Sequence, residues 1–223
     1  MTKSQDKPGS KPTRRERSKA DKMQRILAAG EKLFSNQGFD GTTVQQIADE
    51  ADIAVGTLFL YISDKSELLL RLFHTAMGLE LQQAVGRLKK GRAFVPAVKR
   101  FLKDLMIPYE KDRELANVFW REFLFHKGKV RNELDQQTKV VLRALEEKIV
   151  TAQTKGEIDE HVNAPVGALH LYAIFHATLA FSLADCLPGT SPSHTLDSLL
   201  QSSWRGMAPR TEAVRSVRGS RSV

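Results

Sequence analysis

Apolar residues return every three or four positions along most of the chain, which is the spacing of one face of an α-helix. The first such stretch runs over residues 18–37 and ends at Gly38, a typical C-terminal stop. Between residues 93 and 206 glycine and proline interrupt the pattern, and no strand-like alternation competes with it. The pattern therefore predicts an all-α chain, with C-terminal helices over 94–109, 112–126, 130–154, 165–186 and 193–206.

Residues 43–65, with the sequence TVQQIADEADIAVGTLFLYISDK, predict two short helices joined by a tight turn. Thr43 suits the N-cap of the first helix, because its hydroxyl accepts a hydrogen bond from a free amide of the first turn. Asp52 suits the turn, because a short acceptor side chain tolerates left-handed backbone angles. Small residues that let the helix axes approach lie at Ala48, Ala51 and Gly56. A helix-turn-helix needs such a corner to insert its second helix into a major groove about 12 Å wide, although an ordinary helical hairpin would share these features.

The longer stretch TTVQQIADEADIAVGTLFLYISDKSELL resembles the DNA-binding signature of the tetracycline-repressor (TetR) family. It has the Thr-capped helix, the Ile-Ala core pair, the G-T-L-F-x-Y segment and the following lysine of that signature. The resemblance covers about residues 20–75 and implies an N-terminal three-helix DNA-binding domain of the helix-turn-helix type, followed by a helical ligand-binding and dimerisation domain. The DNA-contacting positions that it implies are Thr43, Gln45, Gly56, Thr57, Tyr61 and Lys65.

The polar members of this set divide by chemistry. Gln45 and Thr57 are candidates for contacts with base edges, whereas Tyr61 and Lys65 are candidates for contacts with phosphates. The sequence departs from the family pattern at Val55, an apolar residue where polar residues are common. We therefore expect DNA readout to depend on thymine methyl groups against Val55 or Ala54, on Gln45 and on DNA shape.

Positive charge is concentrated at the two ends of the chain, whose formal net charge is +8. Residues 1–25 hold nine Lys or Arg against three acidic residues, and residues 205–223 hold five Arg against one. Residues 1–19 combine proline, glycine, serine and charge with almost no apolar side chain, which predicts a disordered basic arm. The arginines expected to reach a minor groove beside the helix-turn-helix are Arg14, Arg15 and Arg17. Two solubilising tails would show the same charge distribution.

These patterns divide the chain into consecutive parts. The predicted parts are a disordered basic arm over 1–19, a helix-turn-helix DNA-binding domain over 20–65, a helical effector-binding and dimerisation domain over 66–206, and a disordered basic tail over 207–223. Within them, a helix over 66–85 is expected to link the DNA-binding domain mechanically to the C-terminal domain.

The segment 165–186 carries apolar residues around its whole circumference, so both sides of this helix need cover. The core of the domain would cover one side and a partner subunit the other. In the TetR family the last two helices commonly form a four-helix dimer interface, and the resemblance implies this role for 165–186 and 193–206. A central helix in a monomeric bundle would also be buried on both sides.

Aromatic residues gather between Tyr109 and Phe125. Core filling is the commoner use of such residues, but a cavity among helices is also where small apolar ligands bind. The resemblance implies that this domain binds an effector. The candidate pocket residues, chosen for apolar bulk with a few polar tips, are Met106, Tyr109, Trp120, Phe123, Leu142, Phe175 and His176.

No residue pattern predicts catalysis, a metal site or a cofactor. His170 and His176 are six positions apart and do not share a helix face, and the single Cys186 supplies no thiolate cluster. The motifs G-x-S-x-G and H-E-x-x-H do not occur. The lone cysteine, with no signal-peptide core after the basic N-terminus, predicts a cytoplasmic, nucleoid-associated protein. The longest apolar stretch, 166–184, contains histidine and hydroxyl side chains and predicts a buried helix, so no membrane segment is expected.

We therefore predict a homodimeric, sequence-specific transcriptional regulator. It would be a repressor that a small apolar or amphipathic ligand releases from a palindromic operator in double-stranded DNA. The alternative is a nonspecific nucleic-acid packaging protein that binds through the basic tails and uses the helical domain only for oligomerisation. A helical enzyme with a DNA-binding appendage would need a catalytic constellation, which the sequence does not contain.

Overall fold

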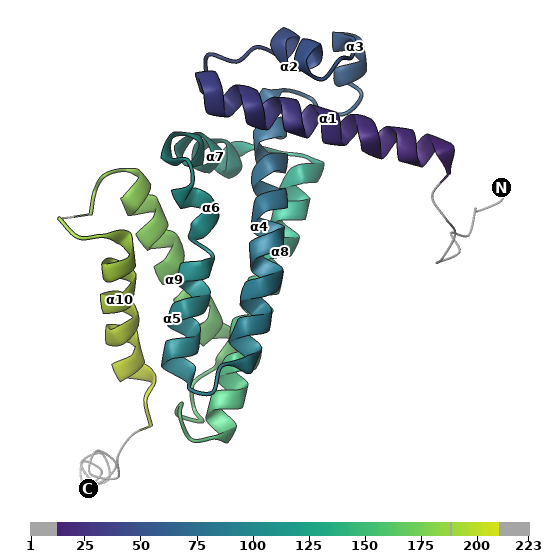
Figure 1. Cartoon of the computed structure of the whole chain (residues 1–223). Helices are drawn as coiled ribbons and strands as arrows, with labels where there is room; N and C mark the ends of the chain where they lie inside the picture. Colours follow the sequence, from purple (N-terminus) through teal and green to yellow (C-terminus); the bar gives the residue numbers. More distant parts are fainter. Residues whose placement is uncertain (1–12, 188, 210–223) are drawn as a thin grey trace, which may run out of the picture. The chain divides into compact units, whose positions relative to one another are not determined.

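The computed structural model describes residues 13–187 and 189–209, and the chain divides into two compact units, residues 1–72 and 73–223. All regular secondary structure of the described residues is helical, which confirms the predicted all-α fold (Figure 1). The first unit contains α1 (Arg14–Gln37), α2 (Val44–Glu50), α3 (Val55–Leu58) and the start of α4 (Lys65–Lys90). The second unit contains the rest of α4, α5 (Phe94–Asp104), α6 (Ile107–Glu110), α7 (Arg113–Phe125), α8 (Lys129–Thr154), α9 (Ala164–Leu183) and α10 (Pro192–Met207).

Helix α1 begins earlier than the hydrophobic pattern predicted. Thr13 and Glu16 form a capping box, in which the Thr13 hydroxyl accepts from the Glu16 amide at 3.2 Å and the Glu16 carboxylate accepts from the Thr13 amide at 2.7 Å. Because this pair stabilises a helix from Arg14 onward, residues 14–19 of the expected disordered arm are helical instead. Residues 1–12 of that arm and residues 210–223 of the expected C-terminal tail lie outside the described residues.

The first unit has a small apolar core. Helix α1 packs against α2, and α2 packs against α3. Gly30 of α1 permits a close approach to the start of α4, because a Cβ at this position would lie 2.6 Å from Cδ2 of Leu68. An alanine at position 30 would therefore force Leu68 to move within a close-packed core. The fully buried side chains of this core include Ile26, Phe34, Ile47, Leu58 and Leu68.

The second unit is a helical bundle in which α8 and α9 form the most extensive pair. Helix α10 packs against both α9 and α5, and α5 also contacts α8. Figure 1 shows α5, α8, α9 and α10 running side by side along this unit. The buried residues that these helices contribute include Phe101, Leu102, Leu145, Ile149, Leu171 and Leu179.

Several helix limits in this unit differ from the sequence prediction, and α4 continues to Lys90 where the predicted helix ended at residue 85. The predicted helix 94–109 is divided into α5 and α6 by a turn at Leu105 and Met106. Pro108 follows this turn and has no amide hydrogen to continue a helical ladder. The predicted helix 165–186 ends at Leu183, and Asp185 beyond it has a left-handed φ of 55°. A left-handed residue stops an α-helix, which explains the earlier end.

Helix α9 is long and apolar enough to cross a membrane, judged by length and composition alone, and no other helix of the described residues passes this test. In this structure it packs against α7, α8 and α10. Its buried residues include Ala168, Leu171, Phe175 and Leu179. The central helix of a bundle has the same composition, but α9 is buried on one side only, since Val166, Leu169 and Phe181 are exposed.

Candidate DNA-binding surface and ligand cavity

The corner between α2 and α3 has the geometry of a helix-turn-helix. Thr43 caps α2, since its hydroxyl accepts from the Gln46 amide at 3.2 Å while the Gln46 side chain accepts from the Thr43 amide at 2.8 Å. Asp52 follows α2 with a left-handed φ of 51°. The Ile53 amide then donates to the carbonyl of Ala48 at 3.0 Å, which closes the turn. Both the cap and the turn residue are those that the sequence predicted.

Arg25 of α1 stabilises this corner through hydrogen bonds. Its Nη2 donates to the backbone carbonyls of Ala51 and Asp52, the latter at 2.6 Å, and to Oδ2 of Asp52 at 2.9 Å. These carbonyls lie at the C-terminal end of α2, where helical carbonyls lack intrahelical partners. Sequence analysis did not single out Arg25, and no local signal could have found it because its partners are 26 and 27 residues away.

Lys65, predicted to contact phosphate, also supports the loop between α1 and α2. Its Nζ donates to the carbonyl of Phe39 at 2.8 Å and to that of Thr42 at 3.1 Å, and it lies 4.4 Å from the centre of the Phe39 ring. An ammonium group has three donors, so one remains for a phosphate oxygen. The phosphate contact stays a prediction, and a Lys65 variant would also lose these loop contacts.

The candidates for base contact lie at the surface. Gln45 is exposed, and its Nε2 donates to Oδ1 of Asp49 at 2.8 Å within α2. Gly56 is exposed, with open space where a Cβ would stand, whereas Val55 and Thr57 are half-buried. The free space at Gly56 permits a close approach of another backbone or a sugar-phosphate chain.

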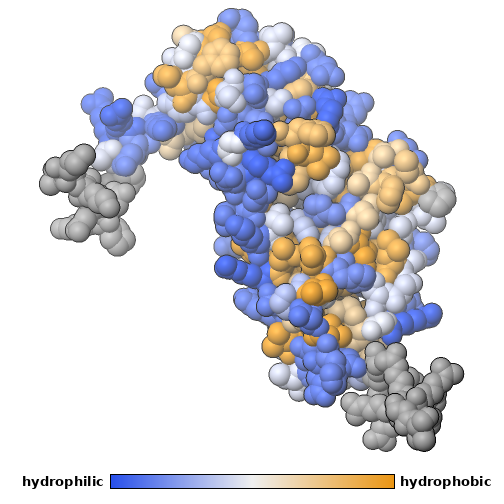
Figure 2. Space-filling view, turned by 180° about the vertical axis from the view of Figure 1, so that it is seen from behind, coloured by the Kyte–Doolittle hydropathy of each residue, from blue (hydrophilic) through white to orange (hydrophobic). Residues whose placement is uncertain are grey.

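Hydrophobic and cationic side chains lie next to each other after α3. Leu60 is 79% exposed and Phe59 is 51% exposed, although neither was predicted as a contact residue. Figure 2 shows hydrophobic surface over the region of α3 at the top of the view, and hydrophilic surface over the first turns of α1. A surface groove between these regions is lined by Arg14, Arg15, Ser18, Lys19, Lys22, Leu60 and Tyr61. The structure thus brings Arg14 and Arg15 together with Tyr61, but Arg17 does not line this groove.

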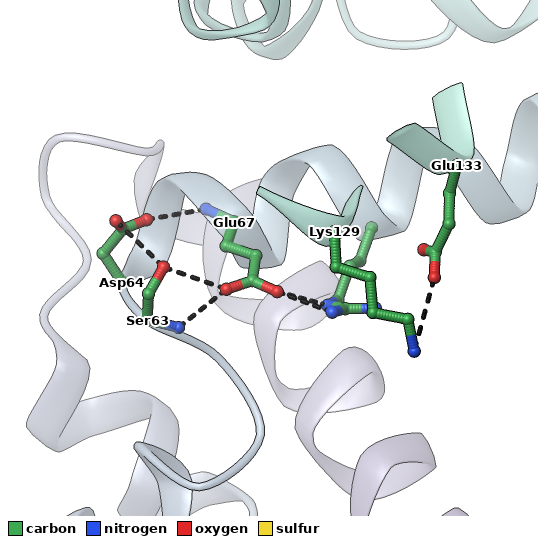
Figure 3. Close-up of polar contacts among 6 residues, drawn as sticks. Ser63, Asp64, Glu67, Lys129 and Glu133 are labelled. Carbon is green, nitrogen blue, oxygen red and sulfur yellow. Dashed lines mark hydrogen bonds and ion pairs between the residues drawn. The ribbon is translucent and has the colours of Figure 1, made fainter. Parts of the chain in front are cut away.

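A polar network caps the start of α4 (Figure 3). The Glu67 carboxylate accepts from the Ser63 amide at 2.8 Å and from Nη2 of Arg71 at 2.6 Å, while the Glu67 amide donates to Oδ1 of Asp64 at 2.7 Å. Burial alone would raise the pKa of Glu67, but the hydrogen bonds from Ser63 and Arg71 outweigh it and lower the pKa. These hydrogen bonds therefore stabilise the first turn of α4. The helix as a whole continues from the first unit into the second.

The second unit contains a cavity of about 30 Å³, room for about one water molecule. Of the predicted pocket residues, Tyr109 and Phe175 line it, whereas Met106, Trp120, Phe123, Leu142 and His176 do not. The lining residues that sequence analysis missed lie mainly on α4 and α8, where an amphipathic pattern does not distinguish a cavity wall from solid core. The full lining is Met77, Glu80, Leu81, Leu105, Pro108, Tyr109, Gln137, Thr138, Val141, Tyr172 and Phe175.

Of the predicted aromatic residues that do not line the cavity, Trp120 and His176 meet between α7 and α9, whereas Phe123 contacts Phe119 of α7 and Arg131 of α8. The ring of His176 lies 5.1 Å from that of Trp120 and 4.2 Å from that of Tyr172, measured between ring centres. Burial lowers the pKa of His176 from 6.5 to about 4. Since the folded state then binds fewer protons than the unfolded state, the stability that the neutral histidine contributes is complete above pH 6.5 and is lost as the pH falls toward 4. In the part of the chain that the structure describes, no cluster of His, Cys, Asp or Glu is arranged for a metal ion.

Comparison with known sequences identifies the first unit. Residues 26–72 match the family model described as bacterial regulatory proteins, tetR family. The chain is 29% identical over 125 residues to the HTH-type transcriptional repressor KstR of Rhodococcus jostii, a match that covers 55% of this chain and 57% of that repressor. It is 22% identical over 163 residues to the fatty acid metabolism regulator protein of Bacillus subtilis, covering 73% of this chain and 84% of that protein.

Solved structures share the fold over most of the chain. The transcriptional regulator FadR from Bacillus subtilis, in complex with stearoyl-CoA, superposes with a TM-score of 0.65 at 20% identity, covering 82% of this chain and 98% of that one. FadR from Thermus thermophilus, in complex with lauroyl-CoA, gives a TM-score of 0.67 at 20% identity, with coverage of 85% and 96%. Residues 26–72, which include the closed helix-turn-helix corner, are thus similar to the tetR family of bacterial regulatory proteins.

Proposed function

We propose that this chain is a homodimeric transcriptional repressor that binds a palindromic operator and leaves it when a small amphipathic effector binds. The observation that carries the proposal is the capped and braced corner between α2 and α3, within the residues that match the family. In this proposal residues 20–65 form the DNA-binding domain and residues 66–206 bind the effector and dimerise. The chain would act in the cytoplasm, at the nucleoid, and as a regulator instead of an enzyme.

On DNA, α3 would enter the major groove. Gln45 and Thr57 would contact base edges, and Val55 would contact thymine methyl groups. Tyr61 and Lys65 would contact phosphates, which set the register but carry no sequence information. The cations that begin α1 would contact phosphates beside α3 as parts of a helix, which replaces the extended minor-groove arm in our interpretation.

The dimer would form through α9 and α10. Although α9 packs inside its own unit, it also exposes Val166, Leu169 and Phe181 to 63%, 57% and 56%. Leu199 of α10 is 41% exposed as well. Side chains of this size on the two helices supply apolar area for a partner subunit, as a stable homodimer requires. The pair of recognition helices would then meet successive major grooves about 34–36 Å apart.

The effector class that we propose is a long-chain acyl-CoA. The two FadR structures described above hold stearoyl-CoA and lauroyl-CoA, and the cavity in the second unit is lined largely by apolar side chains. At about 30 Å³ it is far too small for an acyl chain, so the effector must open it. A ligand that binds only an opened form shifts the population toward that form, by no more than its differential affinity for the two states.

The test compares the affinity of the purified chain for DNA upstream of its own gene with that for random duplex of equal length, at physiological salt. Specific binding exceeds nonspecific binding by at least about a thousandfold in typical repressors. We expect such a ratio, and we expect lauroyl-CoA to release the specific complex. A ratio near one on this DNA and on sites selected from random sequence would instead favour nonspecific nucleic-acid packaging.

A further inference from the structure

An unusual amide lies in the wall of the cavity described above. Gln137 of α8 donates from Nε2 to the backbone carbonyl of His74 in α4 at 2.8 Å. Gly78 lies one helical turn later on α4, and a Cβ at that position would lie 2.9 Å from the same Nε2. Glycine therefore leaves room for the Gln137 amide in this position, and a Cβ would displace it.

This contact fixes the orientation of the amide. A backbone carbonyl only accepts, so the nitrogen of Gln137 must face His74 and the oxygen must point away from it. The oxygen, Oε1, is buried and finds no hydrogen-bond partner among the described residues. A buried acceptor of this kind is costly, and native proteins usually satisfy it with a protein group, a water or a ligand.

The other polar atoms of the cavity wall do not supply the missing donor. The hydroxyls of Tyr172 and Thr138 bond to each other at 3.2 Å, and the Tyr109 hydroxyl donates to the sulfur of Met77 at 3.4 Å. Glu80, the acidic residue in this wall, is paired with Arg87. The wall therefore leaves Gln137 Oε1 without a donor. This acceptor suits a neutral group that donates a hydrogen bond.

We propose that Gln137 Oε1 accepts a hydrogen bond from a hydroxyl group carried on the otherwise apolar chain of the effector. The regulator then selects hydroxylated acyl chains over plain ones, an inference that rests on the proposed function. The cavity has room for about one water, which would pair with Oε1 in the absence of effector. A hydroxyl replaces the hydrogen bond of that water, whereas a plain alkyl chain displaces the water and leaves Oε1 unpaired. The expected preference is at least about tenfold in Kd.

The experiment measures binding of lauroyl-CoA and of its monohydroxylated positional isomers to the full chain by calorimetry, without DNA. We expect at least one isomer to bind at least about tenfold more tightly than lauroyl-CoA. Gln137→Met keeps the length of the side chain but removes the acceptor, so the preference should vanish in this variant. Gln136→Met changes the exposed neighbour on the same helix and should keep the preference.

A second variant guards against misfolding of the first. Gly78→Ala retains Gln137 but places a Cβ where the amide now lies, so it should also reduce the preference while favouring the helix.

Equal affinities for all the probes in the unmodified chain, or a preference that survives in Gln137→Met, would overturn the hydroxyl site and leave the repressor function standing. Failure of every CoA thioester to bind, with operator binding intact, would overturn the effector class and the hydroxyl site together. Loss of operator specificity alone would count against the repressor function, because the calorimetry does not depend on DNA.

Discussion

The corner of the helix-turn-helix should depend on the hydrogen bonds from Arg25 to backbone carbonyls, and only slightly on the ion pair with Asp52. Asp52 is 98% exposed, so its ion pair contributes about 0–0.5 kcal/mol. Hydrogen bonds from a charged donor contribute about 1.5–3 kcal/mol each, and the Arg25 side chain is 38% exposed, which reduces this value. For the two carbonyls together we expect about 2–3 kcal/mol.

Arg25→Met should therefore destabilise the first unit by about 2–3 kcal/mol, whereas Asp52→Asn should cost less than about 0.5 kcal/mol. Asparagine also tolerates the left-handed angles of position 52, so the comparison isolates the charge. Hydrogen exchange followed by mass spectrometry reports the opening free energy of peptides that contain Ile53, whose amide closes the turn. Equal loss of protection in the two variants would refute this reasoning, since it would assign the stability to the ion pair.

Three further predictions concern the other sites. Lys65→Ala should weaken binding to all DNA sequences and reduce by about one the slope of log affinity against log salt concentration, whereas Gln45→Ala should change base preference. Filter binding to operator and to random duplex across salt concentrations measures both, and equal effects of the two variants would show that the assignment is wrong. His176 should account for up to about 3 kcal/mol of the stability that the protein loses between pH 6.5 and pH 4, so His176→Phe should abolish this part of the loss. Urea unfolding at each pH measures the loss, and an unchanged pH dependence would exclude this histidine as the cause. Phe181→Glu should convert a dimer into monomers in sedimentation, whereas Val140→Glu, at an exposed apolar position on α8, should not. A dimer that survives Phe181→Glu would show that the interface lies elsewhere.

Much of the fold follows from local patterns. The spacing of apolar residues predicted an all-α chain, and Thr43 and Asp52 were expected in the roles that they occupy. Caps, turns and amphipathic stripes depend on residues within a few positions of one another, so a sequence shows them directly. The early start of α1 was missed although its capping box is equally local, because the charged residues around Thr13 carry no hydrophobic period.

The residues that line the candidate ligand cavity were harder to predict from the sequence. Tyr109 and Phe175 were expected to line a cavity and do so, whereas Trp120 and His176 pack beside each other away from it. Aromatic bulk is the same in a cavity wall and in solid core, so residue type does not separate them. Gln137, a polar group with an unmet hydrogen bond, was not identified because a glutamine on an amphipathic helix is usually solvated.

The amino-acid sequence by itself determined the helical class, the helix-turn-helix and the family resemblance, all of which arise from short-range periodicity and capping chemistry. Only the tertiary structure decided which distant groups meet: Arg25 with the end of α2, the first turns of α1 with the residues after α3, and Gln137 with α4 beside a cavity. These contacts join residues far apart in the chain. They are set by how helix faces pack and by which buried polar atoms must find partners, and neither condition is visible before the helices are placed together.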